Sequence, residues 1–558
     1  MKLKQWIAAL TVCLMVIGIV RVPAAAAPSL DMLTVETDGC DYRILDADGN
    51  EVDLTAGGSA RKGPRRAPAN LPAAYDARQA GVVTPVKSQG NTGCCWAFSA
   101  IAALESDAIA QGLAGQNADF SEAHLAWFAN RSLVTDEADP THGDGVSHEN
   151  PYLSGGNWAV STAALARWSG INTEASYPFT GQNGYAEADR YGSDSGLVVQ
   201  SVEQLNDTTA IKQWILQHGA VTASFYYSPA YETLVQNQVN GQLVPYTSSY
   251  YCPDKQTTNH QVTIIGWDDT YSSTFYYDPA PTANGAWLVK DSWGTDNHTD
   301  GYLWISYQDA GLGDFYGMTV RPRATGDRNY TYNGAYYTSV TTFDGDCRLA
   351  NVFRAQSEEL LQAAAFNTMI PDQQVTVEVY KLRNSDSTPV RGTPLCTQTL
   401  TLANAGYHTV ALPTVVALSA GDRFSVVVTY KAQAVPSLGS TCAVVPLERN
   451  VDGGSVAYAA AAKTSYFYLN GWREASACGS GICNVYVQAI TACSHSFSDW
   501  HDAESAAPGQ HTQQRACIHC GLTESRTVST GAKVVTLNQL LEMIFAGWKR
   551  MLTNLMKK

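Results

Sequence analysis

The sequence predicts an α+β domain in its first half, followed by a domain built of short β-strands. Residues 96–111 place apolar side chains at helical spacing. Later segments of the same half have the composition of strands: Val221–Tyr226, Val262–Trp267, Ala286–Lys290 and Tyr302–Tyr307. A helix that precedes several strands favours segregated layers with a cleft between two halves, and we assign residues 71–325 to this domain.

From residue 330 to residue 492 the helical periodicity stops. Strand-like segments follow one another with turn residues between them, including Val375–Leu382, His408–Leu412 and Phe424–Tyr430. Regularly spaced short strands of this kind favour a β-sandwich.

The acidic composition of the chain argues against one class of binding partner. The 558-residue chain has 36 Lys and Arg against 51 Asp and Glu, a formal net charge of -15. Nucleic acid is therefore not the expected partner, because phosphate binding needs clustered basic side chains.

The N-terminus resembles a targeting segment. Lys2 and Lys4 precede the uncharged apolar run Trp6–Val20, and small residues follow at Ala24–Ala27. This order predicts a secretory signal peptide over residues 1–27, and an uncleaved anchor is the alternative. The predicted location is extracellular or at the cell surface.

Residues 28–70 are predicted to form a short pro-segment or linker. The segment Arg61–Arg66 is basic and interrupted by Gly and Pro. Both a solvated linker and a processing site fit this composition.

The segment Gln89–Phe98 carries the residues expected of a thiol nucleophile. Cys95 lies where a Gly-containing turn meets the predicted helix, and a helix N-terminus lowers a thiol pKa because unpaired N–H groups favour negative charge. The side-chain amide of Gln89 and the backbone N–H of Cys95 can donate to a developing oxyanion.

A base and its orienting group are predicted downstream. His260 begins an apolar strand, where its ring can be held rigidly at a cleft. Asp291 can accept a hydrogen bond from that imidazole, and its charge should raise the His260 pKa. A solvated turn is the alternative for Asp291.

These segments resemble the papain family of cysteine peptidases. The resemblance covers about 255 residues and rests on these motifs: Pro85-Val86-Lys87-Ser88-Gln89-Gly90, Gly93-Cys94-Cys95-Trp96-Ala97-Phe98, Asn259-His260 before a strand ending Gly266-Trp267, and Asp291-Ser292-Trp293-Gly294. It implies Cys95 as nucleophile, His260 as general acid and base, Asp291 as its orienter and Gln89 in the oxyanion hole. It also implies substrate contacts at Gly155 and Gly156, for which a plain turn is the alternative, and at Trp293, which would shield the His260–Asp291 bond from water.

Three positions depart from the family pattern. Asp291 stands where the family has Asn, Thr92 where it usually has a disulfide-forming Cys, and Cys94 where it usually has Ser or Ala. The resemblance implies peptide-bond hydrolysis through an acyl-enzyme on protein or peptide substrates, with no cofactor required. A weakened adhesin or scaffold on the same fold, and a transamidase using the same residues, remain alternatives.

Residues 330–492 resemble the lectin-like domain of some exported bacterial peptidases, on Ala350–Phe353, Gly406–Val410 and Gly471-Trp472. A cell-surface glycan or wall component is the partner this resemblance implies, although no defined sugar site is evident. Cys478 and Cys483 are close enough in sequence to form a disulfide.

Residues 493–530 form a small Cys/His module. Cys493, His495, Cys517 and Cys520 are ligand types that zinc accepts, and disulfides or free thiols are the alternatives. Residues 536–558 predict an amphipathic helix with a basic end, which could pack on the body, self-associate or contact a membrane.

Overall fold

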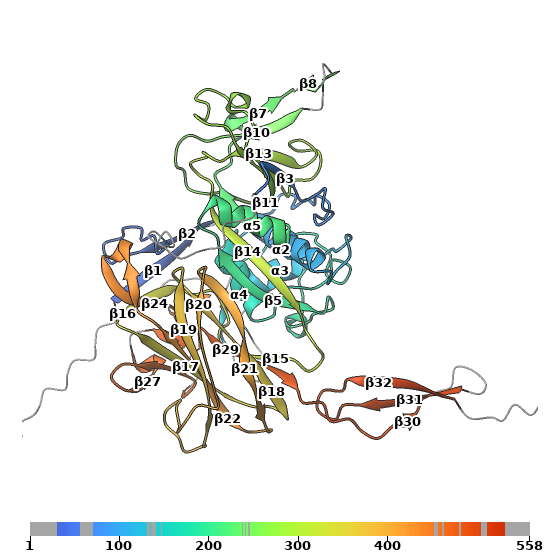
Figure 1. Ribbon diagram of the computed structural model, residues 1–558, viewed down its shortest axis with the longest axis vertical. Coiled ribbons are helices and arrows are strands. Elements are labelled where there is room, and N and C mark those ends of the chain that lie inside the picture. Colours follow the sequence, from blue (N-terminus) through green and yellow to red (C-terminus); the bar gives the residue numbers. More distant parts are fainter. Residues whose placement is uncertain are drawn as a thin grey trace, which may run out of the picture. The chain divides into compact units, whose positions relative to one another are not determined.

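The computed structural model (Figure 1) describes most of the chain between residues 31 and 529. The described residues are 31–38, 40–55, 71–130, 134, 141–146, 148–236, 238–239, 242–243, 246–450, 456–459, 462–478, 481–503 and 510–529. Three predicted features lie outside these ranges: the signal peptide at residues 1–27, the basic segment at residues 61–66 and the amphipathic helix at residues 536–558. Two compact units divide the chain, residues 1–492 and 493–558. Of the helices in the described part, none has the length and apolar character that crossing a bilayer requires.

A long buried helix organises the first domain. The predicted helix at 96–111 is confirmed as α2 (Cys95–Ala110), which is buried from Cys95 to Ala108. The further α-helices of the described residues are α3 (Glu122–Asn130), α4 (Trp158–Ala166) and α5 (Thr208–His218). Ser121 caps α3, because its hydroxyl accepts the backbone N–H of His124 at 3.0 Å.

The predicted strands of this domain are also present. β11 (His260–Asp268) lies between β6 (Val221–Phe225) and β12 (Ala286–Lys290), both antiparallel to it. The other strands of this part are β3 (Ala74–Asp76), β5 (Leu197–Gln204), β7 (Glu232–Val235), β10 (Thr247–Tyr250), β13 (Tyr302–Ser306) and β14 (Gly313–Pro322). The element order, a helical part before a sheet, is the one the sequence predicts (Figure 1).

The second domain is built of β-strands, as predicted. One sheet has the order β20-β19-β22-β17-β26-β27, a second contains β16, β24, β23 and β28, and β15, β29, β18 and β21 extend the sheet of the first domain. Their bounds are β15 (Arg328–Tyr330), β16 (Ser339–Asp344), β17 (Cys347–Arg354), β18 (Glu359–Thr368), β19 (Gln373–Leu382), β20 (Cys396–Leu402), β21 (Gly406–Leu418), β22 (Arg423–Tyr430), β23 (Gln433–Val435), β24 (Ser440–Arg449), β26 (Ser465–Tyr468), β27 (Trp472–Glu474), β28 (Ile482–Val485) and β29 (Val487–Cys493).

The two domains share one sheet, which the sequence did not predict. Antiparallel pairing of β21 with β5 joins them, and the close approach uses Gly406, whose added Cβ would lie 2.0 Å from the Val202 carbonyl oxygen. The shared sheet runs β15-β29-β18-β21-β5-β14-β6-β11-β12-β13-β10-β7. The strands that form the site are therefore continuous with those of the second domain.

The predicted pro-segment forms a hairpin that belongs to the second domain. β1 (Asp31–Asp38) pairs with β2 (Asp41–Leu45) and, on its other side, with β16. Figure 1 shows this blue hairpin beside β16. An edge strand presents unpaired backbone groups, so β16 can hold β1 through main-chain hydrogen bonds.

The remaining elements are small. Short pairs form between β4 (Gly145–Val146) and β25 (Val456–Ala457), and between β8 (Gln238–Val239) and β9 (Gln242–Leu243). Single 3₁₀ turns lie at Glu187–Asp189, Pro229–Tyr231, Ser273–Phe275, Pro436–Leu438 and Ala475–Ala477. The second unit holds the sheet β30 (His501–Asp502), β31 (Gln510–Ala516) and β32 (Thr523–Ser529).

The sequence left a disulfide between Cys478 and Cys483 open, and in the structure both thiols are free. Cys478 Sγ donates to the Glu474 carbonyl at 3.2 Å, whereas Cys483 Sγ donates to the Gly481 carbonyl at 3.3 Å. Proximity in sequence was insufficient, because the 3₁₀ turn and β28 direct the two thiols to different backbone groups.

Candidate active site

Cys95 is the first residue of α2 and is buried. The turn before it is fixed by Gly93, whose N–H donates to the Tyr152 carbonyl at 2.7 Å. The first-turn N–H groups of a helix lack intrahelical partners and favour a nearby anion. A hydrogen bond with Cys40 lowers the pKa of Cys95 most, burial opposes that shift, and the backbone N–H of Gln261 donates to the sulfur and lowers the pKa further.

His260 interacts with Cys95 from the start of β11. Its Nε2 lies 2.7 Å from Asp291 Oδ1, which leaves Nδ1 for the thiol. Burial lowers the pKa of His260, but the charge and hydrogen bond of Asp291, together with the Cys95 thiolate, outweigh it and raise the pKa to about 10. The imidazole in turn lowers the pKa of Cys95. The geometry therefore favours a thiolate–imidazolium pair.

Asp291 accepts hydrogen bonds from two imidazoles rather than one. It follows the last residue of β12, and its Oδ2 lies 2.8 Å from Nε2 of His298. The other ring nitrogen of His298 lies 2.8 Å from Glu232 Oε1. The sequence analysis missed His298 and Glu232, because no motif links two residues 66 positions apart.

His298 is predominantly a cation near neutral pH. Burial lowers the pKa of His298, but hydrogen bonds and charge from Asp291 and Glu232 raise it to about 9. The imidazolium partly offsets the negative charge of Asp291. Asp291 with His298 is therefore closer in charge to the neutral Asn of the papain pattern than Asp291 alone would be.

Trp293 covers this group of residues. Its ring stacks on His260 with centroids 4.3 Å apart and planes inclined by 20°, and it also stacks on His298 at 5.5 Å. The placement agrees with the predicted shielding of the His260–Asp291 bond. A contact between Trp293 and substrate remains a prediction.

Gln89 is buried beside Cys95 and is oriented by two hydrogen bonds. Its Oε1 accepts from the Ser292 hydroxyl at 2.7 Å, and its Nε2 donates to the Thr92 carbonyl at 2.7 Å. The amide nitrogen carries two N–H groups, so one remains to serve an oxyanion. Thr92, which stands where the family has a Cys, donates its own hydroxyl to the Gln89 carbonyl at 2.8 Å.

Glycine is required at position 156 by packing. An added Cβ there would lie 2.6 Å from the Trp96 ring, and the backbone φ is +158°. The carbonyl of Gly155 accepts from the Asn130 side chain at 3.0 Å. These contacts account for the Gly155-Gly156 pair structurally, and its role in binding substrate remains a prediction.

Cys94 and Cys95 have different environments. Cys94 Sγ donates to the Tyr152 carbonyl at 3.4 Å, and burial raises its pKa to about 12. A protonated, buried thiol is a poor nucleophile. The surroundings therefore favour Cys95 over Cys94 as the nucleophile, as the sequence predicts.

The hairpin of β1 and β2 occupies the site. Cys40, in its turn, places Sγ 3.4 Å from Sγ of Cys95, and both residues are buried. The Asp41 carbonyl accepts from Asn157 at 3.1 Å, next to Gly156, and Tyr42 packs on Trp158 with centroids 4.7 Å apart. The sequence gives no signal for this contact, since a single cysteine in a linker carries no pairing information.

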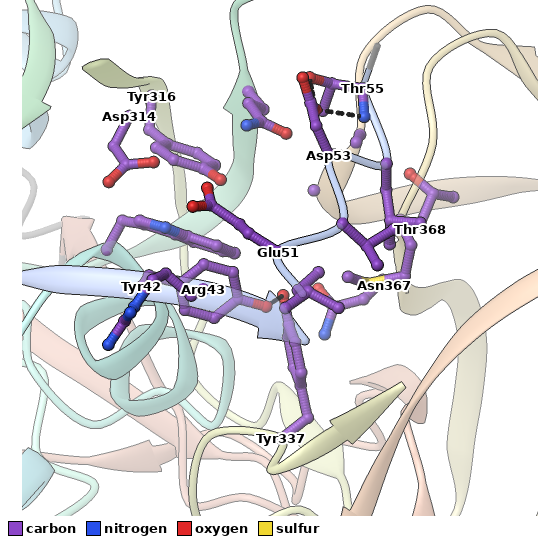
Figure 2. Close-up of a pocket in the computed structure, with 18 residues that line it drawn as sticks. Tyr42, Arg43, Glu51, Asp53, Thr55, Asp314, Tyr316, Tyr337, Asn367 and Thr368 are labelled. Carbon is purple, nitrogen blue, oxygen red and sulfur yellow. Dashed lines mark hydrogen bonds between the residues drawn. The ribbon is translucent and has the colours of Figure 1, made fainter. Parts of the chain in front are cut away.

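A cavity of about 220 Å³ lies beside the hairpin. Figure 2 shows Glu51 pointing toward Tyr316 and Asp314 of the first domain, whereas Asp53 is turned toward Thr55. Burial raises the pKa of Asp314 to about 7, and the charges of Asp41 and Glu51 add to the shift. The electrostatics of this cavity therefore depend on the hairpin being in place.

Comparison with known proteins agrees with this geometry. The family model described as papain family cysteine protease matches residues 71–319, and the lectin like domain model matches residues 330–491. Pro-cathepsin H of Medicago truncatula is 30% identical over 233 residues, which is 42% of this chain and 56% of that protein. The chain thus spans a little over half the length of this curated relative.

Two solved structures are similar over most of the chain. A clostridial cysteine protease, Cwp84, solved after propeptide cleavage, is 27% identical with a TM-score of 0.61, covering 75% of this chain and 99% of that one. A structure of the cysteine protease and lectin-like domains of Cwp84, a surface layer associated protein of Clostridium difficile, is 24% identical with a TM-score of 0.64, covering 84% and 99%. The second likeness shows the fold alone. The chain therefore carries a papain-family cysteine protease domain followed by a lectin-like domain.

Proposed function

We propose that this chain is the precursor of an exported cysteine endopeptidase that hydrolyses peptide bonds through a Cys95 thiolate. The observation that carries the proposal is the buried group of Cys95, His260 and Asp291, in which His260 interacts with the thiol and lies 2.7 Å from Asp291, whose charge raises the pKa of the imidazole. A papain-like scaffold that had lost activity would have no need to preserve this charge pair.

Each residue then has a role in acyl transfer. The Cys95 thiolate attacks the peptide carbonyl, and the oxyanion receives hydrogen bonds from the Cys95 backbone N–H and the free N–H of Gln89. His260 donates its proton to the leaving amine and then takes a proton from water, which attacks the thioester. Asp291 and Trp293 hold the ring in the tautomer and orientation that these steps need.

The same arrangement supports a latent precursor. The hairpin turn at Cys40 lies on the nucleophile, so a substrate carbonyl cannot approach Cys95 until β1 and β2 leave. Cleavage at the basic segment Arg61–Arg66 would cut the covalent link between the hairpin and the first domain and so allow the hairpin to leave. The predicted signal peptide, and the surface-layer association stated for Cwp84, support export to the cell surface.

The lectin-like domain is proposed to contact a glycan or wall component. Tyr468 and Trp472 lie near each other on the β26–β27 hairpin, with ring centroids 5.5 Å apart, and Tyr468 is exposed. Exposed aromatic faces are suited to stacking on sugars. Binding of the Trp472→Ala variant to isolated cell-wall polysaccharide tests this role.

The peptidase proposal is tested with the processed protein and its Cys95→Ala variant. We expect cleavage of a fluorogenic peptide library by the wild type, labelling of Cys95 by an epoxysuccinyl thiol probe, and neither with the variant. Cys94→Ala is the matched control and should retain labelling, because its thiol is protonated and turned toward Tyr152. Absence of both cleavage and labelling in the processed wild type would contradict the proposal, whereas amine incorporation in place of hydrolysis would indicate a transamidase.

A further inference from the structure

The Cys/His module at residues 493–529 brings four ligand-type side chains to one point. Cys493, His495, Cys517 and Cys520 each offer a ligand atom, and these atoms all lie within 4.8 Å of one another. Cys493 Sγ lies 3.6 Å from Cys517 Sγ, and Cys520 Sγ lies 3.4 Å from His495 Nδ1. A tetrahedral zinc ion with its usual bond lengths separates sulfur ligands by about 3.8 Å and sulfur from nitrogen by about 3.5 Å. The side chains are thus already spaced as zinc ligands.

The backbone of the module holds these side chains in place. Cys517 and Cys520 lie in the turn between β31 and β32, where the Gly521 N–H donates to the Cys517 carbonyl at 2.8 Å. Gly521 has a φ of +75°, which favours glycine, and His495 has a φ of +29°. The Ile518 N–H donates to the Ser496 carbonyl at 2.8 Å, which ties the second pair of ligands to the first.

Few side chains are buried in the part of the module that the structure describes. Among the side chains described between residues 493 and 527, only those of Cys493 and Cys517 are buried, and Ile518 is 68% exposed. A domain this small needs disulfides or a metal to fold, because it buries too little apolar surface. The two buried residues are themselves members of the four-residue cluster.

We propose that the module binds one structural zinc ion through Cys493, His495, Cys517 and Cys520. Four protein ligands close the coordination sphere, so the ion stabilises the fold and leaves no position for a substrate. Binding releases the thiol protons of the three cysteines to solvent and involves no change in oxidation state.

Metal analysis of the full-length chain tests this proposal. We expect about one zinc per chain in the wild type, as for a closed four-ligand site, and less than about a tenth of that in Cys517→Ser and Cys520→Ser. Cys478→Ser is the matched control, a partly exposed thiol outside the module, and should retain its zinc. Replacement by Co²⁺ should give the absorption of a tetrahedral thiolate site.

A second readout separates zinc from a disulfide. Removal of zinc with a chelator should raise amide hydrogen exchange in β31 and β32 of the wild type, and ZnCl₂ should restore protection. A zinc-free wild type with a Cys493–Cys517 disulfide in its peptide map would overturn the proposal. So would full zinc content in both ligand variants.

A different observation concerns Cys40. Its thiol and that of Cys95 are buried together at 3.4 Å, on a hairpin that pairs with β16 on its other edge. The hydrogen bond to Cys95 and burial raise the pKa of Cys40, while the same bond lowers that of Cys95. Cys40 thus donates its S–H to the nucleophile and excludes substrate from it.

We also infer that Cys40 and Cys95 form a reversible disulfide that locks the precursor under oxidising conditions. The inference rests on the proposed function of Cys95 as a reactive thiolate. The thiolate attacks a hydroperoxide, which gives a sulfenic acid at Cys95 and releases hydroxide or alkoxide. Cys40 sulfur then attacks the sulfenic sulfur and forms the disulfide, and its proton leaves with the hydroxyl group as water. A dithiol reductant reverses the lock by exchange.

Oxidation of the full-length precursor with hydrogen peroxide tests the lock. We expect a peptide joining Cys40 to Cys95, loss of Cys95 labelling after processing, and recovery of labelling with dithiothreitol. In Cys40→Ser the sulfenic acid has no partner, so Cys95 should be oxidised further to the sulfinic acid, which dithiothreitol does not reverse. Cys478→Ser is the thiol control and should behave as the wild type.

The outcomes separate the lock from the peptidase proposal. Labelling of Cys95 in the reduced, processed protein with no Cys40–Cys95 peptide after oxidation overturns the lock and leaves the nucleophile intact. A Cys40–Cys94 peptide overturns it equally. Failure of Cys95 to label in the reduced, processed protein instead counts against the proposed function.

Discussion

Two places in this chain bring cysteine and histidine together, with opposite surroundings. At the candidate active site Cys95 and His260 are both buried, and the charge of Asp291 favours the imidazolium. In the C-terminal module His495 is exposed, and the cluster contains three thiols and no carboxylate. The same residue types thus make a reactive charge pair in one setting and a ligand set in the other. What decides between them is the partner of the imidazole and the number of sulfur atoms.

A substitution in either region should impair the function of that region and leave the function of the other unchanged. His260→Ala in the processed protein should lower kcat/KM for a peptide by about 10³-fold or more, because it removes the general acid and the partner of the thiolate, and should leave zinc content unchanged. Cys520→Ser should remove zinc and change kcat/KM by no more than about twofold, because the two sites lie in separate compact units of the chain. A loss of peptidase activity in Cys520→Ser comparable to that in His260→Ala would show that the regions are not independent.

The charge of Asp291 is what most distinguishes the first region. Activity is lost at high pH when His260 loses its proton, and Asp291 raises that pKa to about 10. The imidazolium form of His260 is therefore fully populated below the ordinary histidine pKa and is lost as the pH rises through the raised value. Asp291→Asn keeps a hydrogen-bond acceptor and removes the charge, so the alkaline limb of kcat/KM should move down by about one to three pH units. An alkaline limb that does not move would contradict this account.

Much of the first region could be predicted because its chemistry lies in local segments. The turn before Cys95, the strand that begins at His260 and the residue after β12 each have a short sequence pattern, and the structure brings them together. The helix at 96–111 and the strand at 286–290 are also recognisable from the sequence. Both are buried almost throughout, so they appear as segments rich in apolar residues.

What could not be predicted depends on contacts between distant segments. Cys40 meets Cys95 only because β1 pairs with β16, about 300 residues away, and that pairing has no sequence signature. His298 contacts Asp291 from a turn in which His298 itself has a φ of +52°. The local sequence does not predict this backbone conformation. The sheet that the two domains share likewise depends on pairing between the edges of β5 and β21, which the sequence does not indicate. Edge pairing uses backbone groups, which every sequence has.

A smaller effect should separate the hairpin from the rest of the active site. Asp314 has a pKa of about 7 with the hairpin docked, because burial and the charges of Asp41 and Glu51 oppose its ionisation, while Lys255 favours it slightly. The docked state therefore holds a proton that the released state loses, so docking is strongest at acid pH and weakens as the pH rises from about 4 to 7.

Asp314→Asn should remove most of this pH dependence. We expect hydrogen exchange in β1 and β2 of the wild type, corrected for the intrinsic pH dependence of exchange, to increase several-fold between pH 5 and pH 8, consistent with a carboxyl shift of this sign. The variant should show a flat profile. Asp53→Asn is the matched control, since its carboxylate accepts from Thr55 at an exposed turn of the same cavity. A wild-type profile as flat as that of the variant would refute the role of Asp314.

The smallest expected effect has the opposite sign to that of Asp291→Asn. His298→Gln keeps a donor to Asp291 but removes a cation, so Asp291 acts on His260 with less compensation. The alkaline limb should then move up by a fraction of a pH unit, about the size expected for a partly screened charge, with little change in kcat at neutral pH. Glu232→Gln lowers the pKa of His298 and should shift the limb in the same direction by less. A downward shift in His298→Gln would mean that His298 acts by orienting Asp291, and the description of the pair as a near-neutral replacement for Asn would be wrong.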